Sequence, residues 1–334
     1  MFTFHVLGGG EVRAAIDKTR PEIFDRVRDT YLAHHRGETV NPNSYFLRFP
    51  DRPRARIIAL PAALRGPDGV AGIKWIGSFP DNVPLNIPRA SAVLVLNDLD
   101  TGYPFACLEA SQISAARTAA SAVLGAEALQ GSRSAGRVAV IGAGVISRTV
   151  VEFLDALGWS VGEVVVFDTV AAYADNAVRH ASRLGYRGSA AVSLEDAVLG
   201  ADLVVLATTA TEPHLIDPGL LAPGQNVLNI SLRDLGPELI AGAHNILDDV
   251  EHCLNAGTSP HLAVQKYGHR DFIDGTLAEL LLGEITLGQT KPRVFSPFGL
   301  GVLDLAVGVD ILRSGLESGG AVAIPDFFAE LERW

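Results

Sequence analysis

The middle third of the chain alternates short apolar runs with amphipathic segments. The apolar runs are residues 137–144, 163–168, 202–209, 226–231 and 245–249. Strands that read as uninterrupted apolar runs are buried on both faces, which is typical of a parallel sheet covered by helices. The segments between the runs favour helices, among them AAYADNAVRHASRLG and SLEDAVLGAD, the latter with a serine N-cap. This pattern predicts an α/β Rossmann domain.

The first 110 residues have a different pattern, in which a helix at about 21–36 precedes four strand-like runs. These runs are NSYFLRF, RARIIALPAAL, VAGIKWIGSF and SAVLVLND, with Pro, Gly, Asp and Asn between them. They predict a mostly antiparallel or mixed sheet. The Ala-rich segment 111–129 favours a helix that bridges two domains, and the amphipathic tail favours a helix that returns to the first domain.

We therefore expect an α/β protein with a Rossmann domain and a second, mixed α/β domain. The expected bounds are 1–130 with 302–334 for the mixed domain and 131–301 for the Rossmann domain. At 334 residues the chain is long enough for two separate cores.

Composition narrows the class of protein. Its 48% hydrophobic and 19% charged residues are those of a globular protein, and no apolar run approaches the roughly 20 residues of a membrane span. A net charge of −11 argues against nucleic-acid binding. The N-terminus lacks the pattern of a secretory signal, and two distant cysteines favour a reducing compartment. We expect a cytoplasmic protein with no membrane or nucleic-acid partner.

A glycine turn follows the first apolar run of the middle third, in the stretch IGAGVIS. Gly142 permits the tight turn and Gly144 lets a pyrophosphate approach the helix N-terminus, while Ser147 stands where a third glycine is usual. Arg148 is a candidate for a further phosphate contact. Asp168 ends the second strand, where a carboxylate binds a ribose hydroxyl and repels a 2′-phosphate, so we expect NAD rather than NADP. A Rossmann-like domain without a nucleotide remains the alternative.

Other candidate cofactor contacts follow from position at the turn or at strand ends. They are Val145, Ile146, Thr208, Thr209 and Ser231.

Four cations of the N-terminal part stand among uncharged residues: Arg48, Lys74, Arg89 and Arg117. Arg117 lies in a helix of small residues with no carboxylate one turn away, so its negative partner must come from outside that helix. Each cation alone is more often a surface residue. Together, in an acidic protein, they favour a site for a substrate with several carboxylates, which we expect Arg117 to bind.

Further acids and bases are less distinctive. Arg233 and Asp234 follow a strand end and are functional candidates. The acids Asp248, Asp249 and Glu251 are either a ligand cluster or, as we favour, a solvated strand end. The histidines form no metal-binding spacing, and we expect no metal.

Read together, GIKWIGSFPDN, IPRASAVLVLNDLDTGYPFACLEA, SAARTAASAVLGAEAL and the IGAG turn resemble the ornithine cyclodeaminase and mu-crystallin family over nearly the whole chain. The resemblance implies a homodimer built through the N-terminal domain, NAD as cofactor, and a substrate between the domains. It carries the substrate-carboxylate cations onto Lys74 and Arg117, and less tightly onto Arg48. The family's loop with a catalytic Asp reads ISLRDLGPEL here and is one residue shorter, which argues against ornithine cyclisation.

Within the family, SFPDN and SLRDLGPE resemble the subgroup that supplies 2,3-diaminopropionate, as in the staphyloferrin B pathway. That implies NAD-dependent oxidative cleavage of N-[(2S)-2-amino-2-carboxyethyl]-L-glutamate, for a siderophore or a peptide natural product. Lys74 and Asp234 are then the candidates for proton transfer, and Arg48, Arg89, Arg117 and Arg233 for carboxylate binding. The alternatives are an ornithine cyclodeaminase, a ketimine reductase or alanine dehydrogenase, and a non-catalytic dinucleotide-binding protein.

Overall fold

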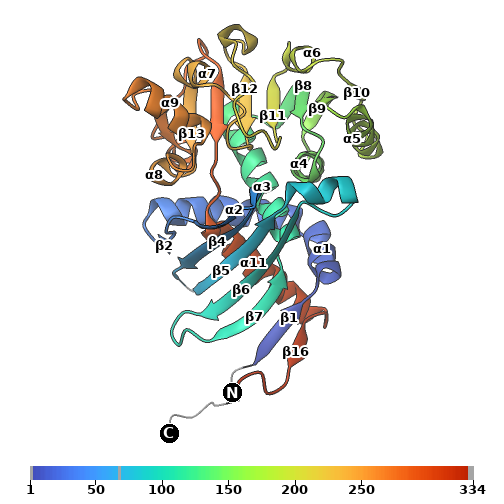
Figure 1. The fold of residues 1–334 in the computed structure, drawn as a ribbon, viewed down its shortest axis with the longest axis vertical. Coiled ribbons are helices and arrows are strands. Elements are labelled where there is room, and N and C mark those ends of the chain that lie inside the picture. Colours follow the sequence, from blue (N-terminus) through green and yellow to red (C-terminus); the bar gives the residue numbers. More distant parts are fainter. Residues whose placement is uncertain (1–2, 67–68, 330–334) are drawn as a thin grey trace. The chain divides into compact units, whose positions relative to one another are not determined.

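The computed structural model describes residues 3–66 and 69–329, which form two compact units (Figure 1). Unit 1 consists of Met1–Arg117 and Leu300–Trp334, and unit 2 of Thr118–Gly299. The division falls inside helix α3 (Ser111–Gln130), whereas the sequence analysis places it after residue 130. Residues 330–334 of the returning segment lie outside the described residues.

The sheet of unit 1 has eight strands, in the order β16-β1-β7-β6-β5-β4-β2 with β3 paired to β4. Their bounds are β1 Phe4–Leu7, β2 Thr39–Val40, β3 Tyr45–Phe49, β4 Arg52–Leu64, β5 Val70–Ser78, β6 Ala90–Asp98, β7 Pro104–Glu109 and β16 Val322–Ile324. Strands β1 and β7 are parallel, and the other pairs are antiparallel. The prediction of a mixed sheet is confirmed.

One face of this sheet is covered by helix α11 (Gly301–Glu317), which packs against β4, β5 and β6 (Figure 1). Helices α1 (Gly9–Lys18) and α2 (Arg20–His35) pack against α11, and a short 3-10 helix spans Pro80–Leu85. The apolar stripe of VLDLAVGVDIL explains why α11 buries most of its residues against the sheet.

The sheet of unit 2 also has eight strands, in the order β10-β9-β8-β11-β12-β15-β13-β14, and every pairing is parallel. Their bounds are β8 Ser134–Ile141, β9 Ser160–Phe167, β10 Gly188–Ala190, β11 Leu203–Leu206, β12 Asn226–Asn229, β13 His244–Leu247, β14 Ile273–Thr276 and β15 Arg293–Ser296. Every residue of β11, β12 and β15 is buried, as strands covered on both faces require. The predicted Rossmann unit is confirmed.

Helices surround this parallel sheet. They are α4 Val145–Ala156, α5 Ala171–Arg183, α6 Leu194–Val198, α7 Pro237–Ala241, α8 Val250–Cys253, α9 Ser259–Tyr267 and α10 Leu277–Leu282, with a 3-10 turn at Pro218–Leu220. The predicted Ser193 cap of α6 accepts a hydrogen bond from the Asp196 amide. No helix within residues 3–66 and 69–329 has both the length and the hydropathy that a bilayer span requires.

Candidate functional site

Lys74 lies on the central strand β5 of unit 1 and faces the helix-covered side of the sheet. Its register partners are Leu60 on β4 and Leu94 on β6, both buried, and Lys74 itself is 1% exposed. Lysine is almost never fully buried unless it is paired. The strand therefore places this ammonium where a partner is required.

The partner is Asp304, from the first turn of α11, which is 0% exposed. Lys74 Nζ lies 2.7 Å from Asp304 Oδ2, and Arg117 Nε from α3 lies 3.1 Å from Asp304 Oδ1. Lys74 Nζ also donates to Ser114 Oγ at 3.0 Å. Two cations that are far apart in sequence thus share one buried carboxylate, and we call Lys74, Arg117 and Asp304 the cation pair with its bridge.

The sequence predicts that the negative partner of Arg117 comes from outside its own helix. That partner is Asp304, a residue of the same chain. The expected binding of a substrate carboxylate by Arg117 stays a prediction beside this internal pairing. Sequence reasoning missed Asp304 although a signal was present, since it is a single acid inside the apolar stripe VLDLAVG. A buried acid in such a stripe requires a cation opposite it.

The charges of the cation pair shape the acidity of Lys74. Burial is the main cause that lowers the pKa of Lys74 to about 8, and the nearby Arg117 guanidinium lowers it further. Asp304 acts in the opposite direction through its charge and its hydrogen bond. An amine with this pKa can both bind a carboxylate as an ammonium and exchange a proton near neutral pH.

Arg117 retains capacity for another anion. Its side chain is 10% exposed, and its hydrogen bond to Asp304 uses Nε. The two Nη atoms take no part in that bond, so they are candidate donors for a carboxylate.

Two further cations occupy the same face of the sheet as Lys74. Arg48 on β3 lies opposite Arg56, which lies opposite Ser78 on β5, and directly opposed residues share a face. Arg89 donates to Ser78 Oγ at 2.7 Å, and burial lowers the pKa of Arg89. Arg48 is exposed, with its guanidinium 5.0 Å from the Phe46 ring. Ser78 is four residues, about 13 Å of strand, from Lys74.

The glycine turn of unit 2 has the geometry of a dinucleotide cradle. Gly142 has φ +89°, and a Cβ there would lie 2.8 Å from the Ala207 carbonyl oxygen, so no other residue fits. Gly144 is the N-cap of α4, with open space where its Cβ would be. The first turn of α4 thus has the room and the amide donors that a pyrophosphate needs. The Ser147 hydroxyl, which is buried, donates to the Gly142 carbonyl and supports the turn.

Asp168 follows β9 and holds the glycine turn. Its Oδ2 accepts from the Ala143 amide at 2.8 Å, and its Oδ1 accepts from the Val170 amide at 2.8 Å. Each carboxylate oxygen has a second acceptor site, so these bonds leave capacity for a ribose hydroxyl.

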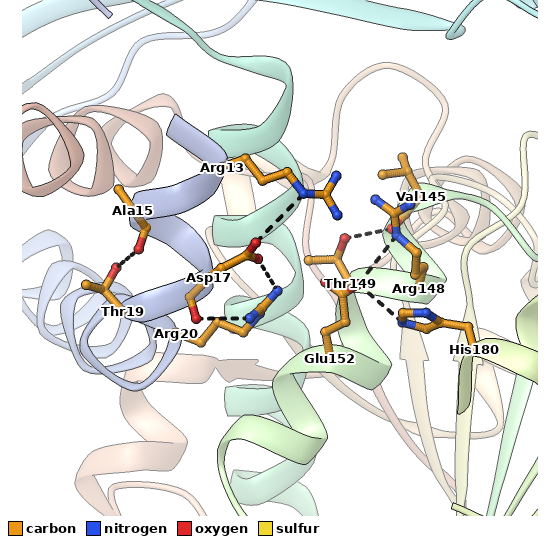
Figure 2. Close-up of polar contacts among 10 residues, drawn as sticks. All are labelled: Arg13, Ala15, Asp17, Thr19, Arg20, Val145, Arg148, Thr149, Glu152 and His180. Atoms are coloured by element: carbon orange, nitrogen blue, oxygen red, sulfur yellow. Dashed lines mark hydrogen bonds and ion pairs between the residues drawn. The ribbon is translucent and has the colours of Figure 1, made fainter. Parts of the chain in front are cut away.

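Figure 2 shows the contacts of Arg148 on α4. Its Nε lies 3.5 Å from Glu152 Oε1, which is also 3.2 Å from His180 Nε2. Arg148 is exposed, and Glu152 neutralises part of the charge that a phosphate contact would use. Val145, the first residue of α4, is exposed, and Ile146 is half-buried.

The loops after β11 and β12 bring together Thr208 and Asp234, which the sequence predicts for different roles. Thr208 Oγ1 donates to Asp234 Oδ1 at 2.6 Å, so this hydroxyl orients the carboxylate. Asp234 is 0% exposed, and its Oδ2 is buried without a hydrogen-bond partner among the described residues. His214, which the sequence analysis did not single out, places Nδ1 3.9 Å from Asp234 Oδ1. Thr209 is exposed in the same loop, and Ser231 is half-buried after β12.

Arg233 is engaged with the backbone of its own unit. Its Nη1 donates to the Thr211 carbonyl at 3.4 Å and its Nη2 to the Ala256 carbonyl at 2.8 Å. These bonds join the loops on either side of Asp234. If Arg233 binds a substrate carboxylate, as the sequence predicts, its guanidinium must do so while it also donates to these two backbone carbonyls.

The acids after β13 differ from the expected solvated strand end. Asp248 is 3% exposed, and it accepts from the amides of Gly299 at 2.7 Å and Asp249 at 2.9 Å. Burial is the main cause that raises the pKa of Asp248. The expectation of solvation is wrong for Asp248, because backbone amides replace water around it. Only Glu251 of this group is exposed. Over residues 3–66 and 69–329, no group of His, Cys, Asp and Glu is arranged to hold a metal ion.

Residues 13–307 match the ornithine cyclodeaminase/mu-crystallin family. The chain is 28% identical over 294 residues to the N-((2S)-2-amino-2-carboxyethyl)-L-glutamate dehydrogenase of Staphylococcus aureus (strain NCTC 8325 / PS 47), with 84% of this chain and 86% of that protein covered.

Two solved structures share the fold. An archaeal alanine dehydrogenase dimer with bound NAD has a TM-score of 0.87 at 24% identity, covering 98% of this chain and 100% of that one. The Thermococcus litoralis Δ1-pyrroline-2-carboxylate reductase, in complex with NADH and L-proline, has a TM-score of 0.87 at 21% identity, covering 97% and 100%. Since the family match spans most of its length, the chain belongs to the ornithine cyclodeaminase/mu-crystallin family.

Proposed function

We propose that this protein is an NAD-dependent amino-acid dehydrogenase that acts on a CH–NH bond and oxidatively cleaves N-[(2S)-2-amino-2-carboxyethyl]-L-glutamate. The products are 2-oxoglutarate, L-2,3-diaminopropionate and NADH. The substrate carries three carboxylates around a secondary amine. The observation that carries the proposal is the buried cation pair with its bridge, which presents a net single positive charge for a carboxylate.

The reaction balances as follows. The secondary amine loses a proton, the glutamyl Cα–H bond breaks, and the hydride leaves as the C=N bond forms. NAD, when bound, accepts this hydride. Water then adds to the imine carbon, and the C–N bond breaks to release 2-oxoglutarate and the free amine of 2,3-diaminopropionate.

Residues of this chain would supply binding and proton transfer. Lys74 and Arg117 hold one carboxylate, and Asp234, whose Oδ2 lacks a partner among the described residues, is the acceptor for the amine proton. With its pKa near 8, Lys74 is the second proton carrier. We assign the further carboxylates to Arg48 and Arg89, which lie on the same face of the sheet as Lys74.

Cofactor binding belongs to unit 2. Gly142 and Gly144 form the cradle, and Asp168 favours the ribose hydroxyl of NAD over a 2′-phosphate. The other residues that we propose to contact NAD are Val145, Ile146, Thr209 and Ser231. We place Thr208 there through its bond to Asp234.

A second candidate function has its own support. The net single positive charge of the cation pair with its bridge also suits a substrate with one carboxylate, such as alanine or a cyclic imine, which would make the protein an alanine dehydrogenase or ketimine reductase. The exposed Arg48 and the half-buried Arg89 favour the substrate with more carboxylates.

The assay that tests both candidates follows NADH at 340 nm with purified protein and NAD. The glutamate–diaminopropionate conjugate is compared with alanine, ornithine and glutamate, and NADP replaces NAD as the cofactor control. We expect NADH with the conjugate alone, and 2-oxoglutarate among the products. Turnover of another amino acid without the conjugate would reject the substrate, and NAD binding without any turnover would favour a non-catalytic protein.

The biological setting follows from the product. L-2,3-diaminopropionate would feed a siderophore or a peptide natural product, and we place the reaction in the cytoplasm, where NAD and 2-oxoglutarate are at hand. The two cysteines, Cys107 and Cys253, are unpaired, as a reducing compartment allows.

We also propose that the protein is a homodimer formed through unit 1. The sheet face opposite α11 carries apolar side chains in two adjacent rows, because Trp75, Val93 and Tyr45 share one row and Val6 and Val322 share the other. All five are at least 38% exposed. A contiguous apolar face of this kind marks an interaction surface.

A further inference from the structure

The strongest unexplained feature is a carboxylate delivered from the C-terminal part of the chain into the candidate site. Asp304 comes from α11, 230 residues from Lys74 and 187 residues from Arg117. Its first-turn position on a helix that is buried over most of its length gives it no access to solvent. Each of its oxygens accepts a hydrogen bond from a cation of the chain, so Asp304 acts on a ligand through Lys74 and Arg117.

We propose that Asp304 is a positioning residue that joins Lys74 and Arg117 into one receptor of net single positive charge, so that this part of the site accepts one carboxylate. This inference rests on the proposed function for the identity of the ligand. The receptor, Lys74 and Arg117 joined by Asp304, lies within unit 1. It is therefore testable by measurements that need no enzymatic turnover.

Close packing of α11 brings Asp304 within reach of Lys74. A Cβ at Gly301 would lie 3.1 Å from the Leu60 carbonyl oxygen, and a Cβ at Gly308 would lie 2.2 Å from Leu94 Cδ2. Leu60 and Leu94 are the two register neighbours of Lys74. Glycines on either side of Asp304 therefore let the helix approach the very strands that flank the lysine.

The surroundings of Lys74 leave Asp304 as the sole compensating charge among the described residues. The neighbours in the sheet, Leu60 and Leu94, are apolar, α3 contributes the Arg117 guanidinium and the Ser114 hydroxyl, and α11 contributes Asp304. Without the carboxylate, two buried cations would face each other. Lys74 would then lose its proton at a lower pH, because Asp304 raises its pKa.

The receptor has a consequence for binding. While Lys74 is protonated, the charges of Lys74, Arg117 and Asp304 leave one positive charge for one carboxylate. Deprotonation of Lys74 cancels this charge, so affinity for a carboxylate falls as the pH rises through the pKa of the lysine. A substrate with further carboxylates must bind those elsewhere, which assigns them to other cations.

The test uses Asp304→Asn, which keeps the shape and removes the charge. Asp310→Asn is the matched control, because Asp310 lies on the same helix and binds Arg26 at 2.6 Å and 2.8 Å. Denaturant unfolding from pH 6 to pH 10 follows the titration of Lys74 without any ligand. In the wild type the free energy of unfolding begins to rise near the pKa of Lys74, at about pH 8. We expect this onset to lie a pH unit or more lower in Asp304→Asn and to be unchanged in Asp310→Asn. Equal profiles for Asp304→Asn and the wild type would overturn the proposal.

Calorimetric titration with 2-oxoglutarate in the presence of NADH then separates the two hypotheses. We expect the affinity of the wild type for 2-oxoglutarate to decline as the pH rises through 8, and that of Asp304→Asn to decline at a lower pH, by the same shift as its unfolding profile. Equal binding by both proteins at every pH would overturn the positioning role. A shifted unfolding profile with no 2-oxoglutarate binding by the wild type supports the receptor and rejects the proposed substrate.

Should Asp304→Asn fail to fold, the triple variant Lys74→Met/Arg117→Met/Asp304→Asn decides the matter, because it removes both cations that Asp304 compensates. Recovery of a cooperative unfolding transition in the triple variant shows that Asp304 compensates the buried cations. A triple variant that also fails to fold would overturn the proposal, because packing alone would then explain the aspartate.

Discussion

At the scale of single residues, the buried lysine is the group whose protonation most affects both stability and chemistry. Its amine is held by Asp304 and Ser114 on a strand whose neighbouring positions are leucines. Burial outweighs the carboxylate, so the pKa of Lys74 falls to about 8. The Lys74 amine therefore binds its proton less tightly in the folded protein than in the unfolded chain.

This pKa sets the sign of a stability effect. Between the folded value of about 8 and the ordinary value of 10.5, the unfolded chain binds more protons than the folded protein. Stability attributable to Lys74 is therefore lowest below pH 8 and rises as the pH increases to 10.5. This lowering of the Lys74 pKa corresponds to about 3 kcal/mol in the free energy of unfolding between the two ends of that pH range.

We predict that Lys74→Met loses this dependence, gains stability relative to the wild type below pH 8, and loses activity. Denaturant unfolding at pH 7 and pH 10 measures the difference. Lys291→Met, at an exposed position of unit 2, is the control and should retain the wild-type dependence. Identical slopes for Lys74→Met and the wild type would contradict the assigned pKa.

At the scale of elements, strand alternation and glycine placement determine what each face can do. Lys74 and Trp75 are adjacent on β5, yet the first is buried and the second is 42% exposed, because successive side chains point to opposite faces. In unit 2 the turn between β8 and α4 depends on Gly142, whose backbone lies against Ala207. A substitution there combines backbone strain with a steric clash.

We predict that Gly142→Ala weakens NAD binding by tenfold or more and destabilises the protein. Gly158→Ala is the matched control, because Gly158 also has a positive φ, of +69°, but has open space around its Cβ position. It should cost about 1 kcal/mol of stability from strain alone and leave the dissociation constant of NAD unchanged. Fluorescence titration with NAD together with thermal unfolding measures both effects. Equal affinities in Gly142→Ala and Gly158→Ala would show that the cradle does not bind the cofactor.

At the scale of the whole molecule, the acidic net charge of −11 contrasts with the apolar sheet face of unit 1. Tyr45, Trp75 and Val93 lie in one row of this face, which runs from β3 through Ala59 on β4 to β5 and β6. Covering them removes apolar surface from water at about 25 cal/mol per Å². A second copy of the chain would supply a matching face, since a twofold interface pairs a surface with itself.

We predict that Trp75→Asp converts the proposed homodimer into a monomer. A charge at the centre of the apolar face would have to be desolvated on association. Light scattering after gel filtration at several concentrations gives the mass. Val192→Asp, at a site of unit 2 that is 90% exposed, is the control and should remain dimeric. A monomeric wild-type protein at all concentrations would reject this assembly.

Local sequence patterns predicted most elements because their signals are local. The apolar runs of unit 2 became β8, β9, β11, β12 and β13, and the bridging helix appeared as α3. Strands β1, β2, β7, β10, β14, β15 and β16 were not anticipated. All of them except β7 have four residues or fewer, which is too few for a periodic pattern. The parallel pairing of β1 with β7 depends on contacts between residues that are about a hundred positions apart.

The sequence by itself determined the two kinds of sheet, the glycine turn, and the identity of the cations, because hydrophobic periodicity and glycine conformations are properties of neighbouring residues. Only the tertiary structure decided which groups meet. It paired Asp304 with Lys74 and Arg117, joined Thr208 to Asp234, and buried Asp248 under backbone amides. Such pairings form when a long chain returns to a strand or loop, and the need of a buried charge for a partner does not specify from which part of the chain the partner comes.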